Sequence, residues 1–272
     1  MKAVVKTPIC PLNSQPNHHS ELADEALYGM VVELLEQVDK EWYKVRTHYR
    51  YEGFAHISNL LIGDETADNW QTLPKKVILG KSLCDVLLEP KFQSYPLITL
   101  PLGAIVSPVD KAENGWQKVV LCDGTQGYLR RSFLGEYYTA PPFTDEDAMR
   151  WMIVRNAMRY QNTQYRWGGK SPMGIDCSGL VSMAYMLSGI LIYRDAKIMD
   201  GFPIHPIDLK DIKMGDLIFF PGHVAMYVKD GKYLHSTGKA GSDGFVYNSL
   251  DPEAPDYRRD LKETITAVGS FF

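Results

Sequence analysis

The sequence predicts an α+β protein in which two small β-barrels precede a domain built from a helix and an antiparallel sheet. Three observations predict this: an internal repeat in the first half, short alternating segments in each repeat, and a long uncharged helical segment in the second half. At about 150 residues per domain, 272 residues suggest two domains or several smaller ones. Hydrophobic residues make up 45% of the chain, which is enough to form buried cores.

The first half of the chain aligns with itself without a gap when it is shifted by 74 residues. The aligned pairs include Cys10 with Cys84, Gly29 with Gly103, Trp42 with Trp116, Gly53 with Gly127 and Ser58 with Ser132. A match of this extent indicates internal duplication. We therefore predict one domain at residues 1–62, a linker and a second domain at residues 63–138, and a third domain at residues 139–272.

Each repeat ends in short segments with alternating apolar residues and glycine-containing turns, at residues 42–57 and 116–131. This pattern predicts antiparallel strands. The order of a glycine, then W-x-K-V, then G-[FY] resembles bacterial SH3-like domains, which implies two SH3-like barrels. We interpret Trp42 and Trp116 as barrel core, with a binding platform as the alternative.

Charge and cysteine content exclude several classes of protein. The formal net charge of −4 argues against a protein that neutralises nucleic acid phosphates. The uncharged segment at residues 178–193 is shorter than the roughly 20 apolar residues of a membrane span. Four widely spaced cysteines have no zinc-ligand spacing, so we expect no disulfide framework and no structural metal. The first residues contain no apolar signal-peptide core, so we expect a cytoplasmic protein, and a periplasmic or secreted protein is the alternative if a native leader was removed.

A new domain is predicted to begin after the proline pair at residues 141–142. Thr144 is followed three residues later by Asp147, which is close to the capping-box pattern at a helix start. Apolar residues then recur at helical spacing, which predicts an amphipathic helix with one buried stripe.

Cys177 follows a glycine- and proline-rich loop and lies at the predicted start of the uncharged helix. The first turn of a helix has unpaired backbone N–H groups and the positive end of the helix dipole, both of which favour a thiolate. The same groups could stabilise an oxyanion. Cys177 is therefore a candidate nucleophile, and a structural cysteine is the alternative.

A thiolate nucleophile needs a base and usually a residue that orients the base. His223 and His235 are the candidates, since both lie near ends of predicted strands in residues 215–238. Either histidine alone could be structural. Together with a cysteine at a helix start, they indicate an enzyme.

Five segments of the second half resemble the NlpC-type cell-wall cysteine peptidases, a family with a papain-like core. They are YRWGG at residues 165–169, DCSGL at 176–180, GDLIFF at 215–220, GHVAMY at 222–227 and YLHSTG at 233–238. The resemblance implies Cys177 as nucleophile, His223 as general base and later acid, and His235 as the residue that orients His223. It also implies Tyr165 and Trp167 as substrate-binding residues of the cleft.

Two SH3-like domains followed by this core resemble the γ-D-glutamyl-L-diamino-acid endopeptidases. The resemblance implies cleavage after D-Glu in murein tripeptides or tetrapeptides with a free N-terminal L-Ala, without a metal or cofactor. A free amine needs negative or acceptor groups when it is buried. Asp176 and Ser178 match that need, and Glu52 is a further candidate because the second repeat has Gln126 at its position. A solvated Glu52 at a strand end is the alternative.

The predicted hairpin between the two histidines presents a geometric problem. A two-residue turn at Asp230 and Gly231 would pair His235 with Met226, which places His235 and His223 on opposite faces of the sheet. We therefore predict a bulge or a longer turn if His235 contacts His223. Otherwise another polar residue orients His223.

Two other functions remain open at this point. The chain could bind wall peptides through its SH3-like repeats with a vestigial core, although intact Cys177, His223 and His235 argue against this. It could also be an amidase or acyltransferase with the same nucleophile. Product analysis separates these functions.

Overall fold

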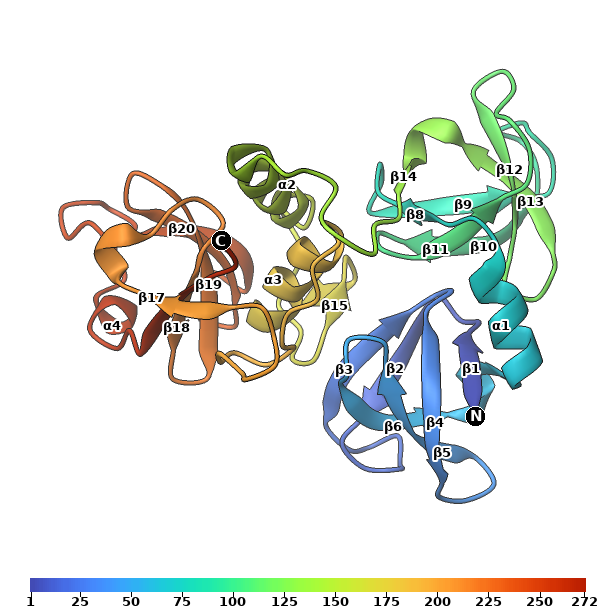
Figure 1. Ribbon diagram of the computed structural model, residues 1–272, viewed down its shortest axis with the longest axis horizontal. Coiled ribbons are helices and arrows are strands. Elements are labelled where there is room, and N and C mark those ends of the chain that lie inside the picture. Colours follow the sequence, from blue (N-terminus) through green and yellow to red (C-terminus); the bar gives the residue numbers. More distant parts are fainter. The chain divides into compact units, whose positions relative to one another are not determined.

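The computed structural model describes all residues, 1–272, and contains two compact units at residues 1–137 and 138–272 (Figure 1). The first unit consists almost entirely of strands, and the second combines helices with one large sheet. These elements confirm the predicted α+β class.

The first seven strands form one curved sheet with the order β3-β2-β6-β5-β4-β1-β7. The strands are β1 (Lys2–Val5), β2 (Ile9–Asn13), β3 (Leu22–Leu27), β4 (Val31–Gln37), β5 (Trp42–Thr47), β6 (Glu52–His56) and β7 (Leu60–Ile62), with a short 3-10 helix η1 (Ile57–Asn59) before β7. Trp42 is buried, as expected for a residue of the barrel core.

The next seven strands repeat this arrangement with the order β10-β9-β13-β12-β11-β8-β14. They are β8 (Lys76–Ile78), β9 (Leu83–Leu87), β10 (Pro96–Pro101), β11 (Ile105–Pro108), β12 (Trp116–Val120), β13 (Gln126–Arg130) and β14 (Leu134–Glu136), with η2 (Arg131–Phe133) before β14. The order matches the first sheet strand for strand, in agreement with the predicted duplication. Trp116 differs from Trp42 because it is only half-buried.

The segment predicted as a linker contains a helix, α1 (Asp64–Thr72). The helix forms because two of its residues, Ala67 and Trp70, are buried on one side. Trp70 Nε1 donates a hydrogen bond to the carbonyl oxygen of Gly29 at 2.8 Å. The helix is therefore anchored to the first barrel.

Backbone contacts join the two barrels of the first unit. The Ile105 N–H donates to the Tyr28 carbonyl at 2.9 Å, and the Cys122 N–H donates to Tyr28 Oη at 2.9 Å. Gly29 has a φ of 78°, and a Cβ there would lie 2.5 Å from the Ile105 carbonyl oxygen. Only glycine fits this close approach.

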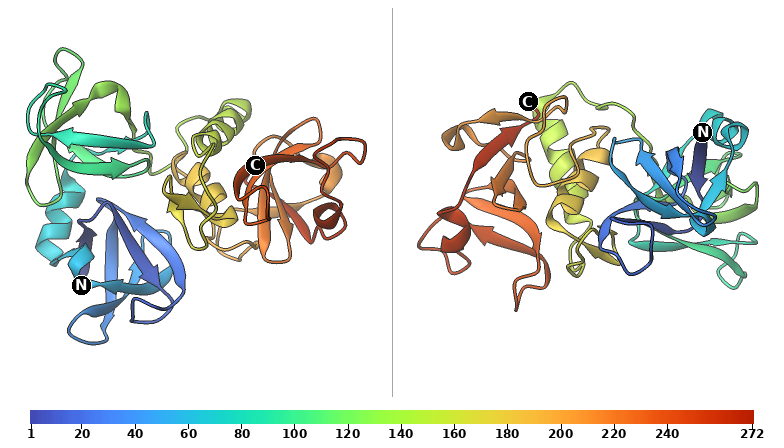
Figure 2. Two further views of the ribbon diagram at one scale, coloured as in Figure 1. Left: turned by 180° about the vertical axis from the view of Figure 1, so that it is seen from behind. Right: turned by 90° about the horizontal axis from the view of Figure 1, so that it is seen from below.

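The second unit contains a six-stranded sheet with the order β17-β22-β18-β19-β20-β21. Its strands are β17 (His205–Ile207), β18 (Leu217–Phe220), β19 (His223–Lys229), β20 (Lys232–Thr237), β21 (Gly244–Ser249) and β22 (Ala267–Ser270), and the remaining elements are α2 (Glu146–Met158), β15 (Lys170–Ser171), β16 (Gly174–Ile175), α3 (Cys177–Met186), η3 (Leu209–Asp211) and α4 (Arg259–Lys262). Helix α3 packs against α2 on one side and against β19 and β20 on the other (Figure 2).

The N-cap of the first helix in this unit lies one residue later than predicted. Asp145, rather than Thr144, is the N-cap of α2, and its carboxylate accepts a hydrogen bond from the Ala148 N–H at 2.7 Å. Aspartate and threonine are both good caps, so the local sequence does not choose between adjacent positions. None of the helices combines the length and hydrophobicity that crossing a bilayer requires.

Candidate active site

Cys177 is the first residue of α3, as the sequence predicted. Asp176 is the N-cap, and its Oδ1 accepts a hydrogen bond from the Gly179 N–H at 2.6 Å. The cysteine therefore lies in the first turn, where backbone N–H groups point out of the helix end. The packing of α3 on the sheet brings Cys177 next to β19. There the backbone N–H of Val224 interacts with the cysteine sulfur and favours its ionised form.

The fold requires a glycine at position 179, in the D-C-S-G segment, for a steric reason. A Cβ on Gly179 would lie 2.2 Å from the carbonyl oxygen of Gly169. No side chain is accommodated at that distance, so Gly179 allows the first turn of α3 to pack on the loop that precedes it. This contact fixes the position of Cys177.

Asp176 forms a buried ion pair with Arg194. Arg194 Nη1 and Nη2 each lie 3.1 Å from one oxygen of the carboxylate, and Nη1 lies 2.6 Å from Ser178 Oγ. The Gly168 N–H also donates to Asp176 Oδ2 at 2.8 Å. Both carboxylate oxygens therefore already accept hydrogen bonds, and a substrate ammonium would share them with Arg194.

The predicted bulge in the histidine hairpin is confirmed. The pairs Tyr227 with Tyr233 and Lys229 with Lys232 leave Val228 without a partner residue on β20. The register of Met226 with Leu234 then places His235 opposite Ala225, on the same face as His223. His223 Nε2 lies 2.7 Å from His235 Nδ1.

Asn248 on β21 extends this chain of polar groups. Its Nδ2 donates to the Asp256 carbonyl at 2.8 Å, which turns Oδ1 toward His235 Nε2, also at 2.8 Å. Because a carbonyl oxygen only accepts, His235 carries its proton on Nε2 and accepts from His223 at Nδ1. His223 is then protonated on Nε2 and has a free lone pair on Nδ1, as a general base requires.

Burial controls the ionisation of these groups. It raises the pKa of the Cys177 thiol to about 11, and the nearby negative charge of Asp176 adds to this effect. Burial lowers the pKa of His223, and the positive charge of Arg258 lowers it further. The pKa of His235 is lowered by burial and then by His223. The helix start therefore does not by itself make Cys177 a thiolate, contrary to the expectation from its position, because loss of solvation is larger.

Cys177 Sγ forms no hydrogen bond with the His223 ring in this structure. Such contacts are often long without substrate and shorten in the reacting complex. Because the thiol and the imidazole are both neutral at neutral pH, a reaction at Cys177 would have to begin with proton transfer from the thiol to His223 Nδ1.

The other predicted substrate-binding residues lie in different surroundings. Burial raises the pKa of the Tyr165 phenol to about 12, and the charge of Cys177 raises it further. The phenol is therefore near the thiol. Trp167 is 59% exposed. Glu52 lies in the first unit, where it pairs with Lys44 at 3.0 Å and with Arg46 at 2.7 Å. The substrate-binding roles of these residues remain predictions.

Sequence reasoning assigned no role to Arg194 and did not identify Asn248. A lone arginine directly after an uncharged segment was a signal for a buried ion pair, since unpaired charges are not buried. No local pattern marks Asn248. Its role depends on the pairing of Tyr233 with Asn248 across β20 and β21.

Comparison with known proteins agrees with this geometry. The NlpC/P60 family profile matches residues 162–253, and the profile of the bacterial dipeptidyl-peptidase Sh3 domain matches residues 12–60. The chain is 45% identical over 275 residues to dipeptidyl-peptidase 6 of Lysinibacillus sphaericus, with 100% of both chains covered. It is 25% identical to the gamma-D-glutamyl-L-lysine dipeptidyl-peptidase of Bacillus cereus, covering 80% of this chain and 68% of that protein.

A solved structure supports the fold. The crystal structure of an NlpC/P60 family protein from Bacillus cereus superimposes with a TM-score of 0.81 over 100% of this chain and 99% of that chain, at 20% sequence identity. The full-length identity to dipeptidyl-peptidase 6 is much higher and extends over both units. The chain therefore belongs to the NlpC/P60 family of cell-wall cysteine peptidases.

Proposed function

We propose that the protein hydrolyses the bond between γ-D-Glu and the diamino acid of murein tripeptides or tetrapeptides, releasing L-Ala-D-Glu. The observation that carries this proposal is the full-length identity of 45% to a dipeptidyl-peptidase 6. A second relative is named for the γ-D-glutamyl-L-lysine bond. A free N-terminal L-Ala is the group that restricts the substrate to short peptides.

The mechanism is covalent catalysis by Cys177 with His223 as base. His223 Nδ1 takes the thiol proton, and Sγ attacks the γ-carbonyl carbon of D-Glu. The oxyanion is held partly by the Cys177 backbone N–H at the start of α3. His223 then gives its proton to the leaving amine as the carbon–nitrogen bond breaks, and water hydrolyses the thioester to free Cys177.

His235 and Asn248 act as positioning residues in this mechanism. The chain from Asn248 Oδ1 to His235 and on to His223 Nε2 holds the imidazole in the tautomer whose Nδ1 is free. Without it, the proton of neutral His223 could occupy Nδ1, where it would block the transfer from Cys177.

We place this activity in the cytoplasm, in the recycling of cell-wall peptides. All four cysteines are free, which suits a reducing compartment. Fractionation of cells that express the native gene, with the protein detected by antibody, tests this location. Recovery from the medium or the wall fraction would contradict it.

Mass spectrometry of products tests the function. L-Ala-γ-D-Glu-diaminopimelate and its N-acetylated analogue are each incubated with wild type and with Cys177→Ala. We expect L-Ala-D-Glu from the free peptide alone and no product with the variant. Cleavage of both peptides would contradict the role of Asp176, Ser178 and Glu52 in recognising the free amine. Transfer of the acyl group to an added amine would indicate an acyltransferase.

A further inference from the structure

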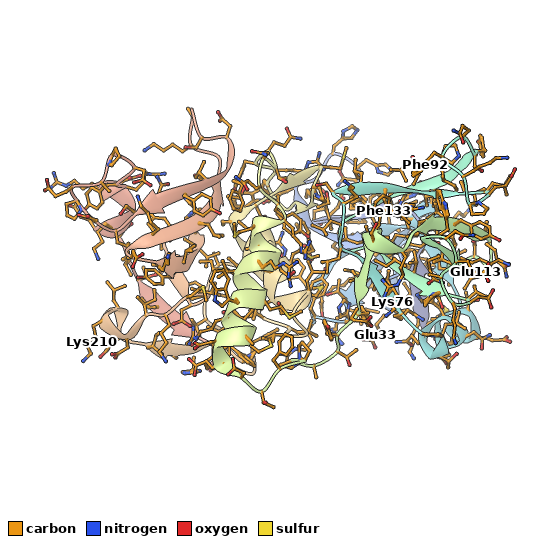
Figure 3. The ribbon with its side chains drawn as sticks, turned by 90° about the horizontal axis from the view of Figure 1, so that it is seen from above. Glu33, Lys76, Phe92, Glu113, Phe133 and Lys210 are labelled. Atoms are coloured by element: carbon orange, nitrogen blue, oxygen red, sulfur yellow. The ribbon has the colours of Figure 1, made fainter.

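The second barrel contains a cavity that the proposed mechanism does not use. Its volume is about 480 Å³, which lies within the range of small-ligand sites. Its walls include Leu83, Phe92, Trp116 and Phe133, all between β8 and β14, and Figure 3 labels Phe92 and Phe133. The cavity is therefore formed within one barrel.

The duplication provides an internal comparison for this site. In the first barrel, the rings of His18, Trp42 and His56 form a cluster, with 4.9 Å between His18 and Trp42 and 5.2 Å between Trp42 and His56. Trp42 is only 5% exposed. The tryptophan of the first barrel is therefore covered, although His18 at the edge of the cluster is exposed.

The equivalent positions of the second barrel, shifted by 74 residues, hold Phe92, Trp116 and Arg130. The rings of Phe92 and Trp116 lie 5.2 Å apart, and Arg130 Cζ lies 5.0 Å from the Trp116 ring centroid. Phe92 is 73% exposed, and Leu83 and Tyr95 are exposed nearby in the sequence. Leu83 and Phe92 line the same cavity as Trp116, and exposed apolar residues that gather in this way mark interaction sites.

Two cations of the cavity have no acidic partner. The Arg130 side chain makes one hydrogen bond, from Nη1 to the Asn114 carbonyl at 3.4 Å, and Lys81 Nζ lies 5.9 Å from the Phe133 ring. Neither forms an ion pair. The single carboxylate of the lining, Asp85, accepts a hydrogen bond from Thr99 at 2.6 Å. The lining therefore carries a net positive charge.

We propose that this cavity binds a short acidic peptide, with a carboxylate held by Arg130 and Lys81 and an apolar part against Phe92 and Trp116. A guanidinium stacked on an aromatic ring is already ordered and can bind a carboxylate through two hydrogen bonds. The identity of the peptide rests on the proposed function: murein peptides are short and carry several carboxylates. The second barrel would then hold substrate or product at a site separate from Cys177.

The indole N–H signal of Trp116 reports on this site directly. The chain contains five tryptophans, so the signal can be assigned from its loss in Trp116→Phe spectra. Full-length Cys177→Ala protein is titrated with L-Ala-γ-D-Glu-diaminopimelate and followed by proton–nitrogen correlation NMR. We expect a saturable shift of the Trp116 signal, and an apparent Kd at least about tenfold weaker after Arg130→Gln because charged hydrogen bonds are lost.

Two further variants separate recognition from general charge. Phe92→Ser removes an exposed ring and should also weaken the shift about tenfold. Lys210→Gln removes the same charge as Arg130→Gln at an exposed position in the second unit, and it should leave the titration unchanged. Inorganic phosphate alone should not reproduce the shift at the same concentrations.

The proposal is overturned if the Trp116 signal does not move, if Arg130→Gln titrates like the parent, or if phosphate matches the peptide. Failure of the proposed function is visible separately, because wild type would then not cleave the same peptide.

Discussion

Asn248 Oδ1 and His235 Nε2 lie 2.8 Å apart, and this contact determines which nitrogen of each catalytic-site histidine carries a proton. The Asp256 carbonyl fixes the orientation of the Asn248 amide, and His235 transmits that orientation to His223. A side chain without contact to the cysteine therefore decides which nitrogen of His223 can accept a proton.

Asn248→Leu should lower kcat about a hundredfold, at the low end of what general acid–base catalysis contributes, while KM changes little. The reason is that His235 loses its acceptor, so neutral His223 populates the wrong tautomer. Asn248→Asp keeps an acceptor and adds a negative charge, which stabilises the imidazolium form. Its kcat/KM profile should have an acid limb at higher pH than that of wild type. A purely structural role for Asn248 predicts equal acid limbs in both proteins.

The resting nucleophile should be a thiol at neutral pH. Burial raises the pKa of Cys177 to about 11 and lowers the pKa of His223, so both groups are neutral before substrate binds. The ultraviolet thiolate absorbance of wild type minus Cys177→Ser should therefore appear only in the alkaline range, near pH 11. Substantial thiolate absorbance at pH 7 would show instead a resting thiolate–imidazolium pair.

Acid should destabilise the second unit through His235, which is buried, and His223, which is partly buried. Their folded pKa values are lowered below the ordinary value of about 6.5, so the unfolded chain binds more protons at mildly acidic pH. Their contribution to the free energy of unfolding is complete above pH 6.5 and declines as pH falls toward about 4. Each histidine contributes a slope of up to about 1.4 kcal/mol per pH unit.

Urea denaturation of wild type and His223→Gln between neutral pH and pH 4 measures this effect. The variant should have a shallower decline over that window, because one of the two histidines with a lowered pKa no longer titrates. Parallel declines in the two proteins would mean that other groups, such as carboxylates, account for the acid sensitivity.

The ion pair of Arg194 with Asp176 should be important for stability as well as for the site. Both side chains are buried, at 2% and 9% exposure, so Arg194→Met leaves a buried carboxylate without its counter-charge. We expect a loss of about 3–5 kcal/mol in the free energy of unfolding. Adding Asp176→Asn should recover part of the loss, since asparagine also caps helices.

An exposed arginine provides the control for this measurement. Arg259 pairs with Glu263 on the surface, with 78% and 58% of the two side chains exposed. Arg259→Met should cost at most about 1 kcal/mol. A similar loss in the two methionine variants would mean that burial does not determine the cost.

The sequence by itself predicted the two related barrels, the helix that begins at Cys177 and the strands that carry His223 and His235. These features follow from local rules: period-two alternation predicts strands, and a glycine- and proline-rich loop before an uncharged segment predicts a helix that starts at the cysteine. Sequence reasoning also showed that a regular turn at Asp230 and Gly231 would separate the histidines, and the bulge at Val228 resolves that conflict. The register of a hairpin can be inferred from its sequence because a shift of one residue moves every side chain of the strand to the other face of the sheet.

The tertiary structure decided which groups surround these residues and in what charge state. Arg194 reaches Asp176 from a loop, and Asn248 reaches His235 through the pairing of β20 with β21, so the sequence does not identify the partner in either contact. The tertiary structure also decided the ionisation state of the Cys177 thiol. The helix start favours its ionisation, but burial opposes it more strongly, and the balance depends on how much of the fold excludes water from that point.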